Sequence, residues 1–157
     1  MTGKKIGISL AIATAIAVPA EGLRQVAYYD PPGILTVCYG HTGSDVSKNK
    51  TYSIDECKAL LNKDMLNAIE TVDRCAPGLP PEALAAFGDT VYNAGATIAC
   101  NTKRSTAARL LKAGDVPGAC RQLPKWNKAR VAGVLVELPG LTKRRNAAMN
   151  ICLGDQS

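Results

Sequence analysis

Aromatic residues and histidine are scarce in this chain of 157 residues, which has one Trp, one Phe, five Tyr and a single His. The few aromatic residues are not interleaved with the basic ones, as a stacking surface for single-stranded nucleic acid would require. The cysteines form no Cys-x-x-Cys pair, which together with the lone histidine argues against a zinc site. A Gly-rich phosphate loop, an internal repeat and a low-complexity tail are also missing. We therefore expect no nucleic-acid partner, no metal and no organic cofactor.

The length of the chain allows one domain with a substantial core, and the formal net charge is +6. The basic residues are scattered along the sequence rather than gathered in runs. This charge predicts either ordinary solvated lysines and arginines or attraction to an anionic polymer or surface.

Residues 21–36 contain the most informative pattern. Glu21 and Asp30 are separated by eight residues, and Thr36 follows after five more. Glu21 lies in a stretch that can form a helix, the prolines and glycine after Asp30 predict a turn, and residues 34–39 favour a strand. One carboxylate on a helix and one on a turn, with a cleft between them, is what glycoside hydrolysis needs. Two solvated surface acids are the alternative.

The strand ends in Gly40 and His41, and the whole arrangement resembles the phage-type lysozymes, the muramidase family of the T-even phages and their lambdoid relatives. In that family a Glu, eight residues, an Asp, five residues and a Thr precede a strand that ends in Gly-His. The resemblance covers roughly residues 21–153 and implies an α+β, mostly helical fold. Its expected parts are a small β-containing N-lobe at about 21–52, a long connecting helix at about 53–75 and a helical lobe at about 80–154.

The resemblance further implies a phage enzyme of host-cell lysis. Such an enzyme hydrolyses the β-1,4 bond between N-acetylmuramic acid and N-acetylglucosamine in peptidoglycan, an anionic polymer. Glu21 is the expected general acid, its pKa raised by apolar cover from Val26 and from the segment before it. Asp30 is the expected base, and it orients a water that Thr36 helps to hold. This is the inverting scheme, whereas carboxyl groups only ~5 Å apart would make Asp30 a nucleophile.

In the resembled family the histidine of this pattern pairs with an aspartate on the connecting helix, which corresponds to Asp64 here. That pair, with Gly40 beside it, is expected near the site in a structural role. It would raise the pKa of His41 and lower that of Asp64. A role for His41 as a catalytic base is the alternative.

Three further residues are candidates for binding the substrate. Tyr28 and Tyr29 are expected near the cleft, and Asn93 is the third. Arg144 and Arg145 open the last helix and are expected as surface charges; the alternative is that one of them reaches a catalytic carboxylate and tunes the site.

The rest of the chain predicts mainly helices. Ser53 and Glu56 form a capping box, which begins a helix that ends near Arg74. Pro81 opens another helix, which ends before Gly95. We also expect helices over 105–113, 115–122 and 142–153, a turn over 138–140, and Trp126 in the packed core rather than as a sugar platform.

Residues 6–20 contain no charge and follow Lys4 and Lys5. As a helix this stretch spans about 23 Å, less than the ~30 Å hydrocarbon core of a bilayer. A signal peptide cleaved after Ala20 is one interpretation, but cleavage would leave Glu21 as the first residue, without the helical turn that must hold it. We favour an uncleaved, weakly hydrophobic anchor with a cytoplasmic N-terminus. This resembles the signal-anchor-release endolysins of lambdoid phages.

These expectations divide the chain into an anchor segment, 1–20, and a catalytic domain, 21–157. The protein is expected to be a monomer in the host periplasm, tethered at first to the inner membrane through residues 6–20. Once released, the segment should pack against the soluble fold and complete the helix that carries Glu21. A core helix of the soluble fold is the alternative reading of the same residues.

Six cysteines are present, and an even number in an exported protein predicts three disulfides. Six buried free thiols in a cytoplasmic protein are the alternative. Many pairings are possible, and the residues alone do not choose among them. The pairing that we favour ties the strand to the connecting helix, that helix to the loop after the next one, and the last helix to the helical lobe: Cys38–Cys57, Cys75–Cys100 and Cys120–Cys152.

Other functions remain open at this point. A lytic transglycosylase also cuts the glycan strand but needs only the acidic Glu21, so it would tolerate Asp30→Asn. A secreted lysozyme with a cleaved signal peptide, a non-enzymatic membrane-active peptide within residues 4–20 and a wall-binding module are the remaining alternatives.

Overall fold

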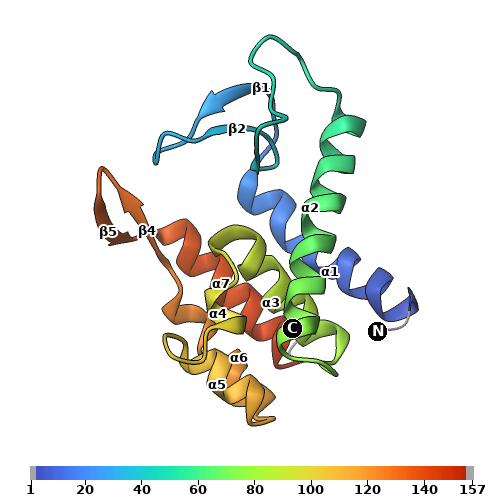
Figure 1. Cartoon of the computed structure of the whole chain (residues 1–157), viewed down its shortest axis with the longest axis vertical. Coiled ribbons are helices and arrows are strands. Elements are labelled where there is room, and N and C mark those ends of the chain that lie inside the picture. Colours follow the sequence, from blue (N-terminus) through green and yellow to red (C-terminus); the bar gives the residue numbers. More distant parts are fainter. Residues whose placement is uncertain (1–2, 155–157) are drawn as a thin grey trace.

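The computed structural model describes residues 3–154, so the outer ends of the two expected segments, 1–2 and 155–157, lie outside the described residues. Helix α1 (Gly3–Glu21) leads into a three-stranded antiparallel sheet of order β1-β2-β3. The strands are β1 (Arg24–Tyr29), β2 (Leu35–Cys38) and β3 (His41–Thr42). Helix α2 (Ile54–Cys75) then runs from the sheet to the other helices (Figure 1).

The second half of the chain is mostly helical. Its elements are α3 (Pro81–Ala94), α4 (Thr97–Cys100), α5 (Thr106–Lys112), α6 (Val116–Cys120), the 3-10 helix η1 (Leu123–Lys125), β4 (Lys128–Val131), β5 (Val134–Glu137) and α7 (Pro139–Cys152). The predicted fold class, α+β and mostly helical with a small sheet in the N-terminal half, is therefore confirmed.

The second half differs from the sequence prediction at the start of α7 and in an additional β-hairpin. Helix α7 begins at Pro139, where the sequence predicts a turn, because proline suits a first helical turn in which its missing N–H has no intrahelical partner. Strands β4 and β5 form a hairpin that no sequence pattern indicated. Its two-residue turn consists of Ala132 and Gly133, whose φ angles of 51° and 81° are those of a type I′ turn.

Helix α2 connects the sheet to the helical lobe and begins at the predicted capping box. The Glu56 backbone N–H donates to Ser53 Oγ at 3.0 Å, and the Ser53 N–H donates to Glu56 Oε1 at 3.1 Å. Ile54, although apolar, is exposed in the first turn. The residues that are buried along α2 are Cys57, Leu61, Met65, Ala68, Ile69 and Val72.

Helix α3 is the centre of the helical lobe, and residues 83–91 are all buried. It packs against α1, α2 and α7, which surround it in Figure 1. A Cβ atom at Gly88 would lie 2.7 Å from Ile69 Cγ1, so the glycine lets α2 and α3 approach closely. This arrangement places Asp89, the one acidic residue of that buried stretch, in the middle of the molecule.

Helix α1 packs against α3 mainly through small residues. Ser9, Ala13 and Ala17 are fully buried there, together with Ile16. Within residues 3–154, α1 is the one helix long and apolar enough to cross a membrane. The opposite face of α1 leaves Ile8 exposed. Helix α1 thus has the composition of a membrane segment, and its buried face consists mainly of small residues, as in a packed helix.

Three disulfides are present, and they are the pairs favoured from the sequence: Cys38–Cys57, Cys75–Cys100 and Cys120–Cys152. They join β2 to α2, α2 to α4, and α6 to α7. Their sequence separations of 19, 25 and 32 correspond to a stabilisation of about 3–4 kcal/mol each in the chain-entropy model. Of the α-helices from α2 onward, α2, α4, α6 and α7 are therefore tied covalently to another element.

Candidate active site

Glu21 is the last residue of α1, and its carboxylate meets polar groups of the helical lobe. Arg144 Nη1 donates to Glu21 Oε1 at 2.6 Å, and Asn93 Nδ2 lies 3.4 Å from the same oxygen. The side chain of Glu21 is 20% exposed. Val26 is exposed, so the expectation that it covers Glu21 with apolar surface is wrong. Arginine and asparagine are the neighbours instead.

Arg144 is buried between two carboxylates. Its Nε and Nη2 atoms donate to the two carboxylate oxygens of Asp89 at 3.0 and 2.7 Å, which leaves Nη1 for Glu21. Burial lowers the pKa of Arg144, but Asp89 and Glu21 outweigh it, and the net shift is upward. Arg144 therefore stays charged and joins α1, α3 and α7. Arg144 is thus not the surface charge expected from the sequence; instead it contacts Glu21, the predicted general acid, as the alternative had it.

Arg145 is also buried, and it holds the substrate-binding candidate Asn93. Its Nη2 donates to Asn93 Oδ1, and its Nε donates to the carbonyl oxygen of Trp126 at 2.8 Å. Burial, followed by repulsion from Arg144, lowers the pKa of Arg145 to about 10. Because Oδ1 of Asn93 faces Arg145, its amide nitrogen faces Glu21. Trp126 itself is partly buried and packs against the core, as expected.

Asp30 is held by the turn between β1 and β2. Its backbone N–H donates to the Ile34 carbonyl at 3.0 Å, and the Ile34 N–H donates to Asp30 Oδ1 at 2.8 Å. The buried Thr36 hydroxyl lies 3.4 Å from Asp30 Oδ2 and 2.9 Å from the Ile34 carbonyl. The strand spacing thus brings Thr36 beside Asp30, and the turn fixes the direction of the carboxylate.

One cleft of about 650 Å³ contains both carboxylates. Glu21, Asp30 and Thr36 line it, together with the candidates Tyr28 and Asn93. Prolines 31 and 32 of the β1–β2 turn and residues 128–131 of β4 also line it. The structure therefore brings the three predicted catalytic residues together between the two lobes.

The two adjacent tyrosines of β1 lie differently, since successive side chains of a strand point to opposite faces. Tyr28 lines the cleft. Burial raises the pKa of its hydroxyl against the effect of Arg24, and both Glu21 and Asp30 add to the increase. Tyr29 does not line the cleft but is exposed, with Lys48 Nζ 4.9 Å from its ring centroid. Of the two tyrosines expected near the cleft, Tyr28 lines it and Tyr29 does not.

Gly40 lies against the other oxygen of Glu21. Its φ is +88°, and a Cβ atom there would lie 2.9 Å from Glu21 Oε2. Beside it, the Tyr92 hydroxyl donates to the carbonyl oxygen of Tyr39 at 2.5 Å. The pKa of Tyr92 is raised by burial and then by Glu21. A glycine is thus required where the β2–β3 turn passes the carboxylate of Glu21.

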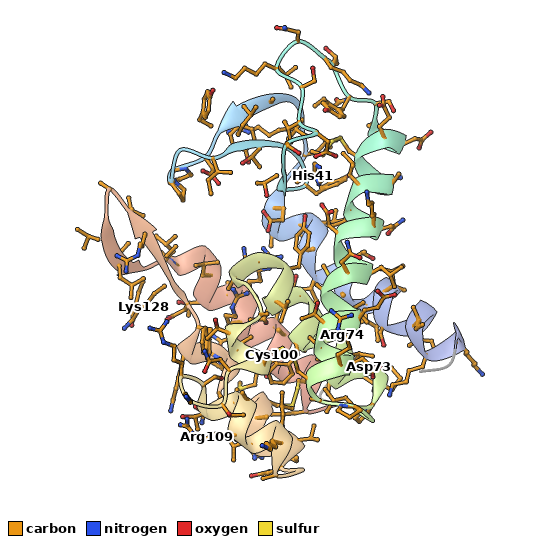
Figure 2. The ribbon with its side chains drawn as sticks, in the orientation of Figure 1. His41, Asp73, Arg74, Cys100, Arg109 and Lys128 are labelled. Carbon is orange, nitrogen blue, oxygen red and sulfur yellow. A yellow bond between two sulfur atoms is a disulfide. The ribbon has the colours of Figure 1, made fainter. Side chains whose placement is uncertain are left out.

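His41 links the sheet to α2, as Figure 2 shows. Its Nδ1 lies 2.5 Å from Asp64 Oδ2, the partner expected from the resemblance, and its Nε2 lies 2.9 Å from Asp45 Oδ1. Burial lowers the pKa of His41, but hydrogen bonds to Asp64 and Asp45 outweigh it and raise the pKa overall. The pKa of Asp45 is lowered, chiefly by its hydrogen bond to His41. Both ring nitrogens of His41 are engaged and the residue does not line the cleft, so the predicted structural role suits this geometry better than that of a catalytic base.

Sequence reasoning missed Asp89, Tyr92 and Asp45 as neighbours of the site. The sequence contained one indication for Asp89, because a carboxylate within an otherwise apolar helix needs a buried partner. No sequence pattern indicated Tyr92 or Asp45. Among residues 3–154, no group of three or more His, Cys, Asp or Glu side chains could hold a metal ion.

Comparisons with known proteins agree with this geometry. The family profile described as Phage lysozyme matches residues 19–148. The chain is 40% identical to a SAR-endolysin of Bacteriophage PS119 over 134 residues, which cover 85% of this chain and 76% of that protein.

The fold is similar to that of the active form of the P1 phage endolysin Lyz, with a TM-score of 0.79 at 20% identity over 93% of this chain and 85% of that chain. The secreted inactive form of P1 phage endolysin Lyz matches with a TM-score of 0.53 at 20% identity, over 73% of this chain and 78% of that chain. The spacing of the site residues, the fold and the profile agree, and the chain belongs to the phage lysozyme family.

Proposed function

We propose that this chain is an endolysin that hydrolyses the β-1,4 bond between N-acetylmuramic acid and N-acetylglucosamine in peptidoglycan. The observation that carries the proposal is the single cleft that is lined by both Glu21, at the end of α1, and Asp30, in the turn after β1. A pair of carboxylates across such a cleft is the common requirement of glycosidases. The similarity to a phage SAR-endolysin supports the same substrate.

In the proposed reaction Glu21 donates a proton to the glycosidic oxygen. Arg144 and Asn93 hold its Oε1 in place. Because Asp89 already balances the charge of Arg144, the arginine offers Glu21 mainly a directed hydrogen bond rather than an unpaired positive charge. The gap that Gly40 leaves beside Oε2 keeps that oxygen unobstructed.

Asp30 acts as the base, and the Thr36 hydroxyl beside it helps to hold the attacking water. We propose inversion at the anomeric carbon, because the Thr36 hydroxyl lies beside Asp30 Oδ2, where it can help to hold a water, and both residues line the cleft. The anomeric form of the first product, followed by NMR during hydrolysis, tests this. A product of retained configuration would make Asp30 a nucleophile.

The protein is exported with α1 as an uncleaved membrane anchor, its N-terminus cytoplasmic, and is released later into the periplasm. Support comes from the composition of α1 and from the closer likeness of this fold to the active than to the secreted inactive form of the P1 endolysin. While α1 lies in the bilayer, Glu21 cannot reach Arg144. The structure with α1 packed on α3 then represents the released, active state.

The test is a turbidity assay on purified cell wall. Glu21→Gln should reduce the rate by about 10²–10⁴-fold, as expected for a positioned general acid. Asp30→Asn should be severe as well, and Thr36→Ala milder. Full activity of Glu21→Gln would refute the assignment. If Asp30→Asn were tolerated and the product carried an anhydro sugar, the protein would be a lytic transglycosylase, and an N-terminus beginning at Glu21 would indicate a cleaved signal peptide.

A further inference from the structure

The charge of the chain is divided unevenly between its two parts. Residues 95–157 contain eleven Lys and Arg against three Asp and Glu, a formal charge of +8. Residues 21–94 contain six basic against ten acidic side chains, a formal charge of −4. One wall of the cleft therefore belongs to an acidic part of the molecule and the other to a basic part.

The basic part reaches the cleft through the β4–β5 hairpin. Lys128 and Arg130 of β4 line the cleft that also contains Glu21 and Asp30. They are two residues apart on one strand, so their side chains share a face of the hairpin. Figure 2 shows Lys128 on the side of the helical lobe that carries this hairpin.

Neither cation is neutralised by a carboxylate of the described chain. Lys128 has no ion pair there, although Glu137 is its cross-strand neighbour. Arg130 Nη1 contacts only the carbonyl oxygen of Gly133, at 3.3 Å. Both side chains are exposed, and the hairpin has no fully buried residue. Positive charge on such an element is not needed for the core and is available to a ligand.

The sugars of the glycan strand carry hydroxyl and N-acetyl groups, which give a cation no charged partner. The carboxylates of peptidoglycan are on the peptide stems attached to its muramic acid units. On the basis of the proposed function, we propose that Lys128 and Arg130 bind free carboxylates of the peptide stems. The enzyme then prefers wall in which these carboxyl groups are free over wall in which they are amidated. The two residues position the strand and determine specificity; they do not take part in bond cleavage.

The test compares kcat and KM on two preparations of one purified wall. One is untreated, and in the other the stem carboxyl groups have been converted to amides with a carbodiimide and ammonia. The wild-type enzyme should lose about tenfold in kcat/KM on the amidated wall, mainly through KM, as two exposed ion pairs would give. The double variant Lys128→Gln/Arg130→Gln should be slower on untreated wall and should no longer distinguish the two.

Two further variants separate a site from general electrostatics. Lys103→Gln/Lys112→Gln removes the same charge from exposed positions of the same lobe outside the cleft, and it should keep the preference. The conservative swap Lys128→Arg/Arg130→Lys should keep it too. Thermal melting of each variant checks that the fold is intact.

Equal wild-type rates on both walls would overturn this inference and leave the proposed function standing. Loss of the preference in Lys103→Gln/Lys112→Gln would also overturn it, because net charge alone would then explain the effect. Failure of the wild-type enzyme to hydrolyse either wall, by contrast, would count against the proposed function itself.

Discussion

At the scale of single residues, the proposed acid Glu21 depends on hydrogen-bonding partners that lie far from it in the sequence. Arg144 contacts Glu21 and Asp89 at once, with its side chain only 4% exposed. A charge at that depth is tolerated only while its carboxylate partners remain, because removing one leaves an uncompensated buried ion. The direction of the Glu21 carboxylate is therefore a property of the packing of α1, α3 and α7.

Asp89→Asn should lower the free energy of unfolding by about 3–5 kcal/mol, because it removes the bidentate partner of Arg144. Wall hydrolysis by the protein that remains folded should also fall, since the guanidinium is no longer aimed at Glu21. Urea unfolding and the turbidity assay measure the two effects. The double variant Asp89→Leu/Arg144→Met, which removes both charges of this buried pair, should recover stability but not activity. A fully active double variant would show that Arg144 does not position Glu21.

Gly40→Ala should impair activity far more than its effect on stability explains. The positive φ of +88° costs about 1–2 kcal/mol for any L side chain, and the new Cβ would also push against Glu21 Oε2. Gly78→Ala is the matched control, because its φ is +87° and nothing lies within 4 Å of the added atom. Both variants should melt at similarly lowered temperatures, and only Gly40→Ala should lose activity. Equal rates in the two would contradict the clash.

How much of the site the sequence predicts depends on how local each contact is. The roles of Glu21, Asp30 and Thr36 are implied by the resemblance to phage-type lysozymes, and the turn and strand that bring Asp30 and Thr36 together are local structures. The contact of Arg144 with Asp89 spans 55 residues and depends on how α3 and α7 pack, which no periodicity encodes. The sequence therefore points to the proposed catalytic residues and leaves the groups that hold them largely hidden.

At the scale of elements, the same distinction separates α2 from the β4–β5 hairpin. Helix α2 was predictable because a capping box and a regular apolar face both point to it. The hairpin lacks the alternation of a half-buried strand, since its residues are mostly exposed. Its turn is Ala-Gly rather than the usual Asn-Gly, so the strongest hairpin signal is missing as well.

Helix α1 offers two pairs of alanines that separate membrane retention from packing. Ala11→Leu/Ala15→Leu adds apolar surface at exposed positions, whereas Ala13→Leu/Ala17→Leu adds the same surface at fully buried ones. Both pairs should hold the protein in the membrane longer and delay lysis of expressing cells. Once purified, the first variant should fold and hydrolyse wall, and the second should be destabilised by about 1–3 kcal/mol per site through overpacking.

Cell turbidity over time and urea unfolding of the purified variants provide the measurements. Lysis by both variants on the wild-type schedule would contradict the release of α1 as the controlling step. Equal stability of the two purified variants would contradict the packing of α1 on α3.

At the scale of the whole molecule, His41 fastens the sheet to the helical part. Its pKa is raised in the folded protein, so its contribution to stability is fully present below the ordinary histidine pKa of about 6.5 and is lost as pH rises through the folded value. The melting temperature of the wild type relative to His41→Gln should therefore be highest in mildly acidic buffer and should decline above neutrality. Parallel curves for the two proteins would show that the contacts of His41 with Asp64 and Asp45 add no net stability.

The contact between Glu21 and Arg144 joins residues 123 positions apart, one ending the first helix and one inside the last. A chain still on the ribosome that has not yet reached α7 contains both proposed catalytic carboxylates but lacks the group that orients the acid. The same holds for a fragment cut off by a protease or by an early stop codon. With Arg144 in the proposed role, wall cleavage requires α1 and α7 of one polypeptide, so incomplete products pose little danger to a cell that must survive until the phage has assembled.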